Sequence, residues 1–422
     1  MNDERTLLVG LDLGNDFSQL SCFDQTLFEP VPIGEEPGQE VQELIPTVAA
    51  VRDDNHEWVF GKKALQYAQT GKAALLHDIV ISASKGVPLL ARETAFEGRT
   101  VLERFFRFTL SKLKMHYPND TILKLVVTVE EKNKQLTNAI TEAMKVLGIE
   151  EDRLVIQSHK QSYMYYALSQ NKELWNNDVA LFDYGPKGLR YHQISIDRYA
   201  VPMVAGVTEK NLSDVMSADF LETAEDSQVA HGFLEVAKTA MHRQLVSTIY
   251  VTGPGFDTGE WAEPALRELC VGRRVFKGQN LYTKGACYAA RELGGKGKLD
   301  CIFLDDDMVQ SNISIRVYTQ AQTEEVLLVK AGQPWYDIDT SLDVIPDAED
   351  ELQLIIQDLL RKEKRTHLLS LVAIPGRENK MTRFSIRIRF SSPHECIITL
   401  KDKGFGDFEP TSNRIWERIF EM

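Results

Sequence analysis

Apolar positions near the start of the chain form a pattern that returns in its middle. Residues 6–14 are an apolar run that ends in Asp12-Leu13-Gly14, and residues 178–185 are a second run that ends in Asp183-Tyr184-Gly185. Each run has the character of a buried strand, and a turn and a second, alternating strand follow it. The repeat predicts two similar lobes that face each other across a cleft, each offering one carboxylate and one glycine-lined turn.

The segments that follow each run also come in a common order. After the first run, the pattern predicts strands at 17–23, 47–51, 123–129 and 154–156, a largely helical region over 61–115, and helices over 136–147 and around 163–166. The second part predicts strands at 178–182, 189–196, 198–205, 247–251 and 274–276, with helices over 226–246 and 283–293. Strands that alternate with amphipathic helices indicate an α/β architecture in which the helices pack on the sheets.

The pattern changes after the glycine- and lysine-rich segment 294–298. Residues 384–390 alternate between apolar and polar side chains with a period of two, as in a half-buried strand. Further strands are expected at 312–319, 325–330, 351–359, 367–374 and 395–400. We therefore expect a first lobe over 1–170, a second lobe over 171–295, a linker over 296–306 and an antiparallel β-sandwich over 307–422.

Composition and charge narrow the classes of function. The chain has 422 residues and a formal net charge of −14, which argues against a nucleic-acid partner because phosphates would be repelled. No apolar run approaches the roughly 20 residues of a membrane helix, and residues 1–5 are polar, so we expect a cytoplasmic protein without a membrane partner. The five cysteines are scattered and lack the spacing of a zinc site or a disulfide framework.

Several motifs occur in an order that resembles the seventy-kilodalton heat-shock chaperones, a branch of the actin-like ATPase superfamily. Residues 10–15 resemble the first phosphate loop of that family, residues 183–185 stand at its second phosphate loop, and residues 253–255 stand at its adenosine loop. Further similar segments are residues 45–49, 60–64, 125–129, 147–149, 284–290, 300–305 and 369–390. The resemblance implies a two-lobed actin-like ATPase fold of duplicated, ribonuclease H-like lobes, followed by a β-sandwich similar to a chaperone substrate-binding domain.

The same resemblance implies a nucleotide site between the lobes. It would hold ATP or ADP with Mg²⁺, and the implied binding residues are Asp12, Gly14, Asn15, Asp183, Gly185, Gly253 and Gly255. Asp12 and Asp183 would reach the Mg²⁺ through water and are the candidates for catalysis. From the residues alone, each is equally a strand-end aspartate that caps its turn. The resemblance also implies a protein or peptide partner at the C-terminal β domain.

The chain departs from the family at the positions that matter most for catalysis. In the second loop, Pro186 has no backbone N–H for a phosphate and Lys187 is bulky where a backbone should approach closely. In the first loop, Asp16 adds a negative charge, and Ser158 stands where the family has an acidic residue. Only 70 residues (253 − 183) separate Asp183 from Gly253, so most of one subdomain is missing. These departures favour weak or absent ATP binding and hydrolysis, so that the chain carries either ATP or ADP with Mg²⁺ or no cofactor.

Other residues have a chemical and a structural interpretation. Lys85 lies near the position of a catalytic lysine but reads better as a surface lysine, and His159 either replaces the missing acid or simply begins a helix. Tyr163, Tyr165 and Tyr166 would stack on a base, fill the cleft or pack in the core. The arginines of one strand face, at positions 383, 387 and 389, would bind an acidic partner or face solvent.

Three functions remain open at this point. The first is a heat-shock-70-like chaperone or scaffold whose β domain binds a protein or peptide. The second is a slow ATPase or a small-molecule kinase, which needs a general base near the second loop, and only Asp183 and Asp197 are available there. The third is a filament-forming relative of actin.

Overall fold

The computed structural model describes residues 6–34, 44–278, 280–319, 321–346, 351–370 and 380–422. The chain divides into two compact units. The first unit comprises Met1–His192 and Lys210–Leu299, and the second comprises Gln193–Glu209 and Asp300–Met422. The chain is a mixed α/β protein with an antiparallel sheet region at its C-terminus, as its apolar pattern predicts.

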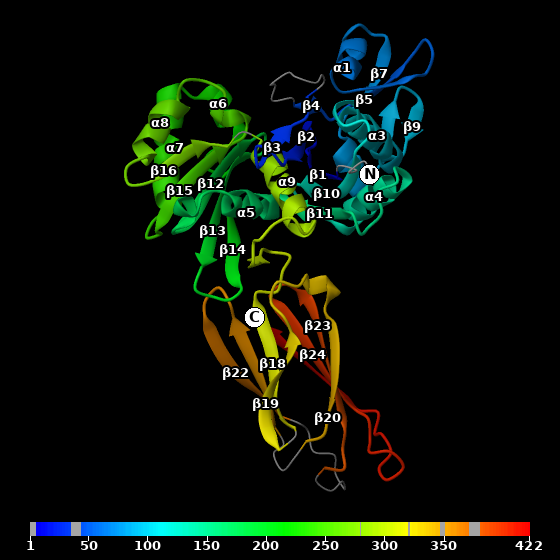
Figure 1. Cartoon of the computed structure of the whole chain (residues 1–422), viewed down its shortest axis with the longest axis vertical. Coiled ribbons are helices and arrows are strands. Elements are labelled where there is room, and N and C mark those ends of the chain that lie inside the picture. The colour runs from blue at the N-terminus through cyan, green and yellow to red at the C-terminus, as the bar shows by residue number, and fades with distance from the viewer. Residues whose placement is uncertain (1–5, 35–43, 279, 320, 347–350, 371–379) are drawn as a thin grey trace. The chain divides into compact units, whose positions relative to one another are not determined.

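The first sheet is built around the opening strand of the chain. Its order is β11 (Leu154–Ser158), β10 (Thr121–Val129), β1 (Thr6–Leu13), β2 (Phe17–Asp24) and β3 (Glu29–Pro32), and β4 (Ile45–Pro46) also pairs with β2. Strand β1 runs parallel to β10 and antiparallel to β2, and β10 runs parallel to β11 (Figure 1).

The second sheet repeats this order from the middle of the chain. It runs β16 (Arg274–Lys277), β15 (Val246–Thr252), β12 (Asp178–Gly185), β13 (Gly188–Asp197), β14 (Met203–Asn211) and β17 (Cys301–Leu304). Strand β12 is parallel to β15, and β15 is parallel to β16. In both sheets the strand that ends in Asp-x-Gly has two parallel strands on one side and the hairpin that follows it on the other. The repeat seen in the sequence is therefore also a repeat of strand order.

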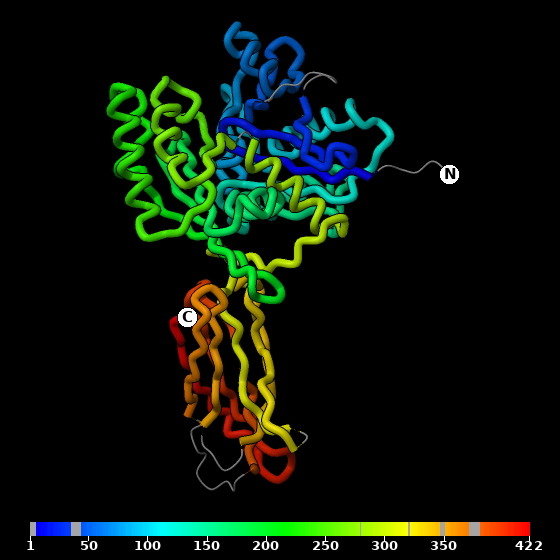
Figure 2. The backbone as a smooth tube through the Cα atoms, turned by 60° about the vertical axis from the view of Figure 1, so that its left-hand side comes forward, coloured from blue at the N-terminus to red at the C-terminus, as the bar shows by residue number. Residues whose placement is uncertain are grey.

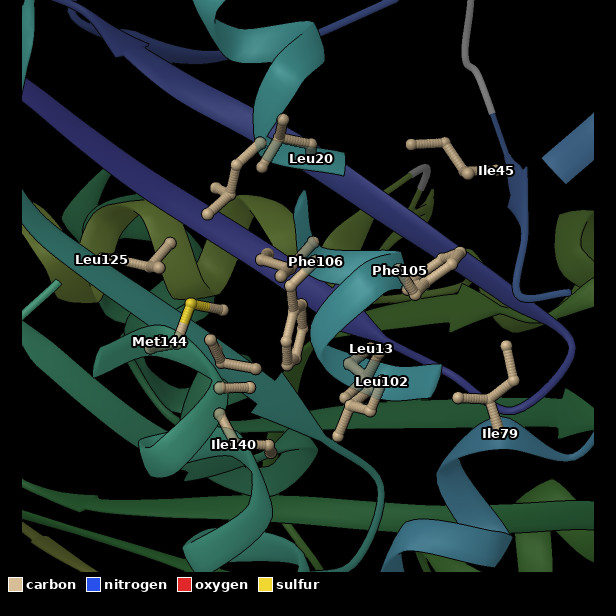
Figure 3. Close-up of a cluster of buried hydrophobic side chains, with 14 of the residues drawn as sticks. Leu13, Leu20, Ile45, Ile79, Leu102, Phe105, Phe106, Leu125, Ile140 and Met144 are labelled. Carbon is tan, nitrogen blue, oxygen red and sulfur yellow. The ribbon is translucent and has the colours of Figure 1, made fainter. Parts of the chain in front are cut away.

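The helices of the described residues are α1 (Gly61–Gln69), α2 (Ile79–Lys85), α3 (Gly98–His116), α4 (Lys134–Val146), α5 (His159–Ser169), α6 (Ala218–Thr223), α7 (Asp226–Ala240), α8 (Ala262–Leu269) and α9 (Leu281–Leu293). Among them, α3, α4 and α9 pack on the first sheet and α7 packs on the second. Buried side chains of α3 and α4, including Phe105, Phe106 and Met144, pack against Leu13 and Leu125 of the first sheet (Figure 3). Phe182 of β12 and Phe233 of α7 belong to a separate core on the second sheet.

One sequence prediction for the first unit was wrong in detail. The region 61–115 is not continuously helical, because the short strands β7 (Ala73–Leu76), β8 (Leu89–Ala91) and β9 (Thr94–Phe96) interrupt it. The strand predicted at 47–51 corresponds to β5 (Ala49–Arg52), which pairs with β6 (Trp58–Phe60) and β7 in a small separate sheet. Strand propensity is a local property, whereas the choice of partner depends on residues distant in the chain.

Helix α9 approaches both β1 and α5 more closely than a side chain would permit. A Cβ atom on Gly285 would lie 1.9 Å from the carbonyl oxygen of Ser162 in α5. A Cβ on Gly10 of β1 would lie 2.4 Å from the backbone nitrogen of Cys287 in α9. Glycine at these two positions therefore sets the distance of α9 from both elements, and α9 carries one of the residues of the site described below.

The second unit contains two antiparallel four-stranded sheets. Figure 2 shows the extended backbone segments of this unit running alongside one another. One has the order β19 (Gln322–Val329), β18 (Ser311–Thr319), β21 (Glu351–Asp358) and β22 (Glu363–Ser370). The other has the order β20 (Asp339–Val344), β23 (Phe384–Ser392), β24 (Glu395–Asp402) and β25 (Ile415–Glu421). One hydrophobic cluster contains residues of both sheets, among them Ile313 and Ile386, so the sheets share a core.

In the second unit, part of the predicted linker forms a strand, and one predicted strand has different bounds. Residues 301–304 of the predicted linker form β17, which pairs in parallel with Met203–Gly206 of β14. The predicted strand 367–374 corresponds to β22, and residues 371–374 lie outside the described part of the chain. On the outer face of β23, Arg387 forms a two-bond ion pair with Asp339, and Arg383, which directly precedes this strand, lies 3.8 Å from Asp343. These cross-strand pairs favour a solvated sheet face over a site for an acidic partner.

Candidate functional site

The first candidate residue, Asp12, lies near the end of β1 and contacts a histidine. Strand β11 ends at Ser158, whose hydroxyl caps α5 by accepting a hydrogen bond from the backbone of Gln161. His159 is therefore the first residue of α5. Its Nε2 lies 2.7 Å from Oδ1 of Asp12, and the side chains of the two residues are only 13% and 15% exposed. The sequence raised His159 as a replacement for the missing acid, and the structure places it against Asp12.

The other face of the site begins at Asp183 and reaches the same histidine. The ring of His159 stacks on Tyr282 with centroids 3.9 Å apart and an angle of 8° between the planes. Tyr282 is the second residue of α9, and its hydroxyl donates a hydrogen bond of 2.6 Å to Oδ2 of Asp183. Both strand-end carboxylates thus lie at one place, and two aromatic side chains join them.

Basic side chains extend this set of contacts beyond Asp183. Arg190 of β13 donates to Oδ2 of Asp183 at 3.3 Å and to Oε1 of Glu130 at 2.7 Å. Lys187, the bulky residue of the second loop, donates to the same oxygen of Glu130 at 3.0 Å. We call the series Asp12, His159, Tyr282, Asp183, Arg190 and Glu130 the bridging network.

Burial and charge shift the pKa values within the bridging network. Burial raises the pKa of Asp183, although Arg190 and the Tyr282 hydroxyl oppose the shift. Burial also raises the pKa of Tyr282 well above its usual value, and Asp183 adds to the shift, so this hydroxyl keeps its proton. Burial alone would raise the pKa of Glu130, but Arg190 and Lys187 outweigh it and hold that pKa below its usual range.

The candidate glycines serve the local packing of the two turns. A Cβ on Gly14 would lie 2.3 Å from the carbonyl oxygen of Phe17, so the first turn has no room for a side chain. Gly253 has a φ of +96°, and a Cβ there would lie 2.6 Å from the carbonyl oxygen of Tyr184 and 2.8 Å from Oδ1 of Asp183. A Cβ on Gly255 would meet the Tyr184 ring at 2.7 Å, whereas one on Gly185 would find only Asp183, at 3.9 Å. The structure therefore brings Gly253 and Gly255 to the Asp183 strand.

Other candidates have different surroundings. The Asn15 amide donates to Asp78 at 2.9 Å, and its buried Oδ1 has no partner among the described residues. Lys85 is exposed at the end of α2, which supports its interpretation as a surface lysine. Asp197, the candidate base for a kinase, forms an ion pair of 2.9 Å with Lys362 in the second unit.

Tyr163 is a core residue and not a surface for a base, because its side chain is fully buried. Its hydroxyl has no hydrogen-bond partner among the described residues, whereas the equally buried Tyr184 donates to the carbonyl of Ser217 at 2.9 Å. We expect Tyr163→Phe to leave the free energy of unfolding unchanged or to raise it by up to about 1 kcal/mol, because it removes an unsatisfied polar group. Tyr184→Phe should lower it by about 1 kcal/mol. Urea denaturation of both variants tests this difference, and an equal loss in both would contradict it.

Sequence reasoning missed three members of the bridging network. Tyr282, Arg190 and Glu130 stand in no motif, and Tyr282 is 99 residues from the aspartate that it contacts. The one local sign was Arg190 itself, a charged residue between two buried apolar neighbours of a strand.

The chain matches two known family models, and neither family has a known function. Residues 29–306 match the family described as "Family of unknown function (DUF5716) C-terminal", which is more than half of the chain. The chain belongs to this DUF5716 family. Residues 308–422 of this DUF5716 family member match the model described as "Domain of unknown function (DUF8552)". No curated protein matches the chain.

Two properties of the described residues concern metal binding and membrane helices. The described residues contain no group of three or more histidine, cysteine, aspartate or glutamate side chains arranged to hold a metal ion. None of the helices in this part of the DUF5716 family member has the length and apolar character that a membrane crossing requires.

Proposed function

We propose that this protein is a divergent heat-shock-70-like member of the actin-like superfamily that acts as a protein-binding scaffold, with its nucleotide site closed by its own side chains. Two observations support the relationship: the strand order that both sheets share, and the two Asp-x-Gly strand ends that meet at one place. The observation that supports a closed nucleotide site is the bridging network. It fills the position between Asp12 and Asp183 where the resemblance implies Mg²⁺ and phosphates.

The residues at this position do not fit a magnesium nucleotide in the observed arrangement. A hydrated Mg²⁺ needs ionised carboxylate oxygens that are open to its water shell. The carboxylate of Asp12 is engaged by His159, and that of Asp183 by Tyr282 and Arg190. The raised pKa of Asp183 further favours its neutral form. Lys187 is held by Glu130, and Pro186 has no N–H to donate. We therefore assign the bridging network a structural role, in which it holds α5 and α9 against the two strand ends.

The partner in this proposal is a protein or peptide that binds the C-terminal β region. That region consists of two antiparallel sheets with a common core, the architecture that the resemblance to the substrate-binding domain implies. Since the scaffold would work without nucleotide, its partner affinity should not depend on ATP.

Calorimetric titration of the full chain with ATP and ADP in the presence of Mg²⁺ tests the closed site. We expect no binding in the low-millimolar range by the natural protein and no phosphate release above background, because ligand binding would have to break the bridging network. Asp12→Ala and Asp183→Ala are the matched variants, since each removes one carboxylate. Sub-millimolar binding that both variants abolish would overturn the closed site.

A second candidate, a slow ATPase, is favoured by one observation: the two carboxylates and the Gly253 turn do lie together. Turnover that depends on Asp12 or Asp183 would establish this activity in place of the scaffold. Small-molecule kinase activity and filament formation lack a supporting observation of their own in the structure.

A further inference from the structure

A groove on the first unit lies between β6 and one face of α3. It encloses a volume of about 470 Å³, and its lining includes Trp58, Phe60, Glu103, Arg104, Arg107 and Phe108. This volume is in the range of binding pockets. None of these residues belongs to the bridging network, so the groove is independent of the site described above.

Three aromatic rings form the apolar part of this groove. Phe60 stacks with both Trp58, at a centroid distance of 6.2 Å, and Phe108, at 5.3 Å, with interplanar angles of 19° and 20°. All three side chains are half-buried, so they retain surface that a ligand can cover. Tryptophan and phenylalanine in a concave surface are typical of positions that receive a large apolar side chain from a partner.

The charged part of the groove is supplied by α3. Arg104 lies with its guanidinium 4.8 Å from the centre of the Trp58 ring. In the part of the chain that the structure describes, no carboxylate lies within salt-bridge distance of Arg104. Arg107 pairs with Glu103 at 2.9 Å, so Arg104 carries the net positive charge of the lining. This basic position is notable on a chain with a net charge of −14.

The dimensions of the lining indicate the size of the ligand. The lining positions on α3 extend from residue 100 to residue 111, which is about 16 Å along a helix axis. An extended peptide covers this distance with about five residues. The half-open groove and its mixed lining therefore suit a short peptide segment with one apolar anchor and neighbouring carboxylates.

We propose that this groove binds a short acidic peptide segment of a partner protein, with a large apolar side chain against Phe60 and Phe108 and a carboxylate on Arg104. Charge complementarity selects this partner, since an anionic segment would be repelled by most of the acidic protein and attracted to the guanidinium. The proposal does not depend on the closed state of the nucleotide site.

Fluorescence anisotropy with labelled model peptides and the full chain tests this site. The probes are Ser-Glu-Asp-Phe-Asp-Glu-Ser, a version with lysine in place of the acidic residues, and a version with serine in place of phenylalanine. We expect the first peptide to bind best and each change to weaken binding by about tenfold or more, since a charge-assisted hydrogen bond and an apolar anchor are each lost. Equal binding of the acidic and lysine peptides, or no binding of any of them, would overturn the proposal.

Two variants on α3 locate the binding. Arg104→Glu should weaken the acidic peptide by about tenfold or more, because it places a carboxylate beside the ligand. Arg99→Glu is the matched control: Arg99 is exposed on the same helix, outside the groove, and pairs with Glu97. The control should leave the affinity unchanged. Equal effects of both variants on the affinity would show a non-specific effect of charge. Self-association that Arg104→Glu abolishes would identify a second copy of the chain as the occupant of the groove. Either result would reject the proposed peptide site.

Discussion

Replacing Gly285 by alanine is expected to lower the free energy of unfolding of the first unit by about 3 kcal/mol. The added Cβ would lie 1.9 Å from the carbonyl oxygen of Ser162, and this neighbour is backbone that cannot rotate away. Helices α5 and α9 would have to separate, which would also pull Tyr282 away from His159 and Asp183. Urea denaturation followed by tryptophan fluorescence measures the loss.

Gly232 provides the matched control for this substitution, because it also lies inside a helix, α7. A Cβ there would lie 3.3 Å from the sulfur of the Met216 side chain and at an ordinary contact distance of 3.6 Å from the Phe220 ring, and it would meet no backbone atom within these distances. Alanine is favoured over glycine by roughly 1 kcal/mol in a helix interior, so Gly232→Ala should leave stability unchanged or raise it. A similar loss in both variants would mean that the close approach of α5 and α9 does not determine the effect.

Replacing Arg190 by alanine is expected to destabilise the first unit by about 3 kcal/mol at neutral pH. The substitution removes the cation that Asp183 and Glu130 share and leaves the two carboxylates close together and partly buried. The Arg190 side chain is only 19% exposed, so solvent would replace its hydrogen bonds poorly. This is a larger effect than that expected for an ion pair on the surface.

The decrease in the free energy of unfolding caused by Arg190→Ala should grow as the pH rises from acidic to neutral. Asp183 has a folded pKa above its unfolded value of about 3.9, so its protonated form stabilises the fold at low pH and this contribution is lost as pH rises through the folded pKa. Without Arg190 the folded pKa of Asp183 rises further, so that loss is larger. Glu130 has a folded pKa below its unfolded value of about 4.3, so it stabilises the natural fold at higher pH, and the variant loses the part of this contribution that Arg190 supplies while Lys187 keeps its own.

Denaturation of the natural protein and the variant over a series of pH values measures this trend. Both carboxylates act in the same direction, so the difference between the two proteins should be smallest below about pH 4. Asp183→Asn removes one of the two titrating groups and should reduce the slope of the difference. A gap that stays constant with pH would show that Arg190 acts by packing and not by charge.

Prediction from sequence was most successful where a short stretch of chain carries all the information. The strands that carry Asp12 and Asp183 are confirmed, as is the helix that begins near His159, because apolar periodicity and helix caps are local. Prediction was less successful for the pairing of strands with one another. The segment at 47–51 does form a strand, but the sequence pattern did not show that this strand pairs with β6 and β7 in a separate sheet.

The side chains that lie between the two aspartates also could not be predicted from local sequence patterns. The tyrosines proposed to fill it were Tyr163 and Tyr165, which lie on a helix with a visible aromatic pattern. Tyr163 is instead buried in the core, and the ring between the two aspartates belongs to Tyr282 on a different helix. A helical period identifies which residues share a face, but it does not show which face turns toward a carboxylate 99 residues away.

By itself, the sequence determined that this protein contains two copies of a strand that ends in Asp-x-Gly, within an α/β region followed by antiparallel strands. Tertiary structure alone decided what lies between those copies, since the stacking of His159 on Tyr282 and the pairing of Arg190 with Glu130 depend on how closely α9 and β13 approach their neighbours. Hydrophobic periodicity is set by nearest neighbours along the chain, whereas a hydrogen bond between distant side chains exists only after the core has packed.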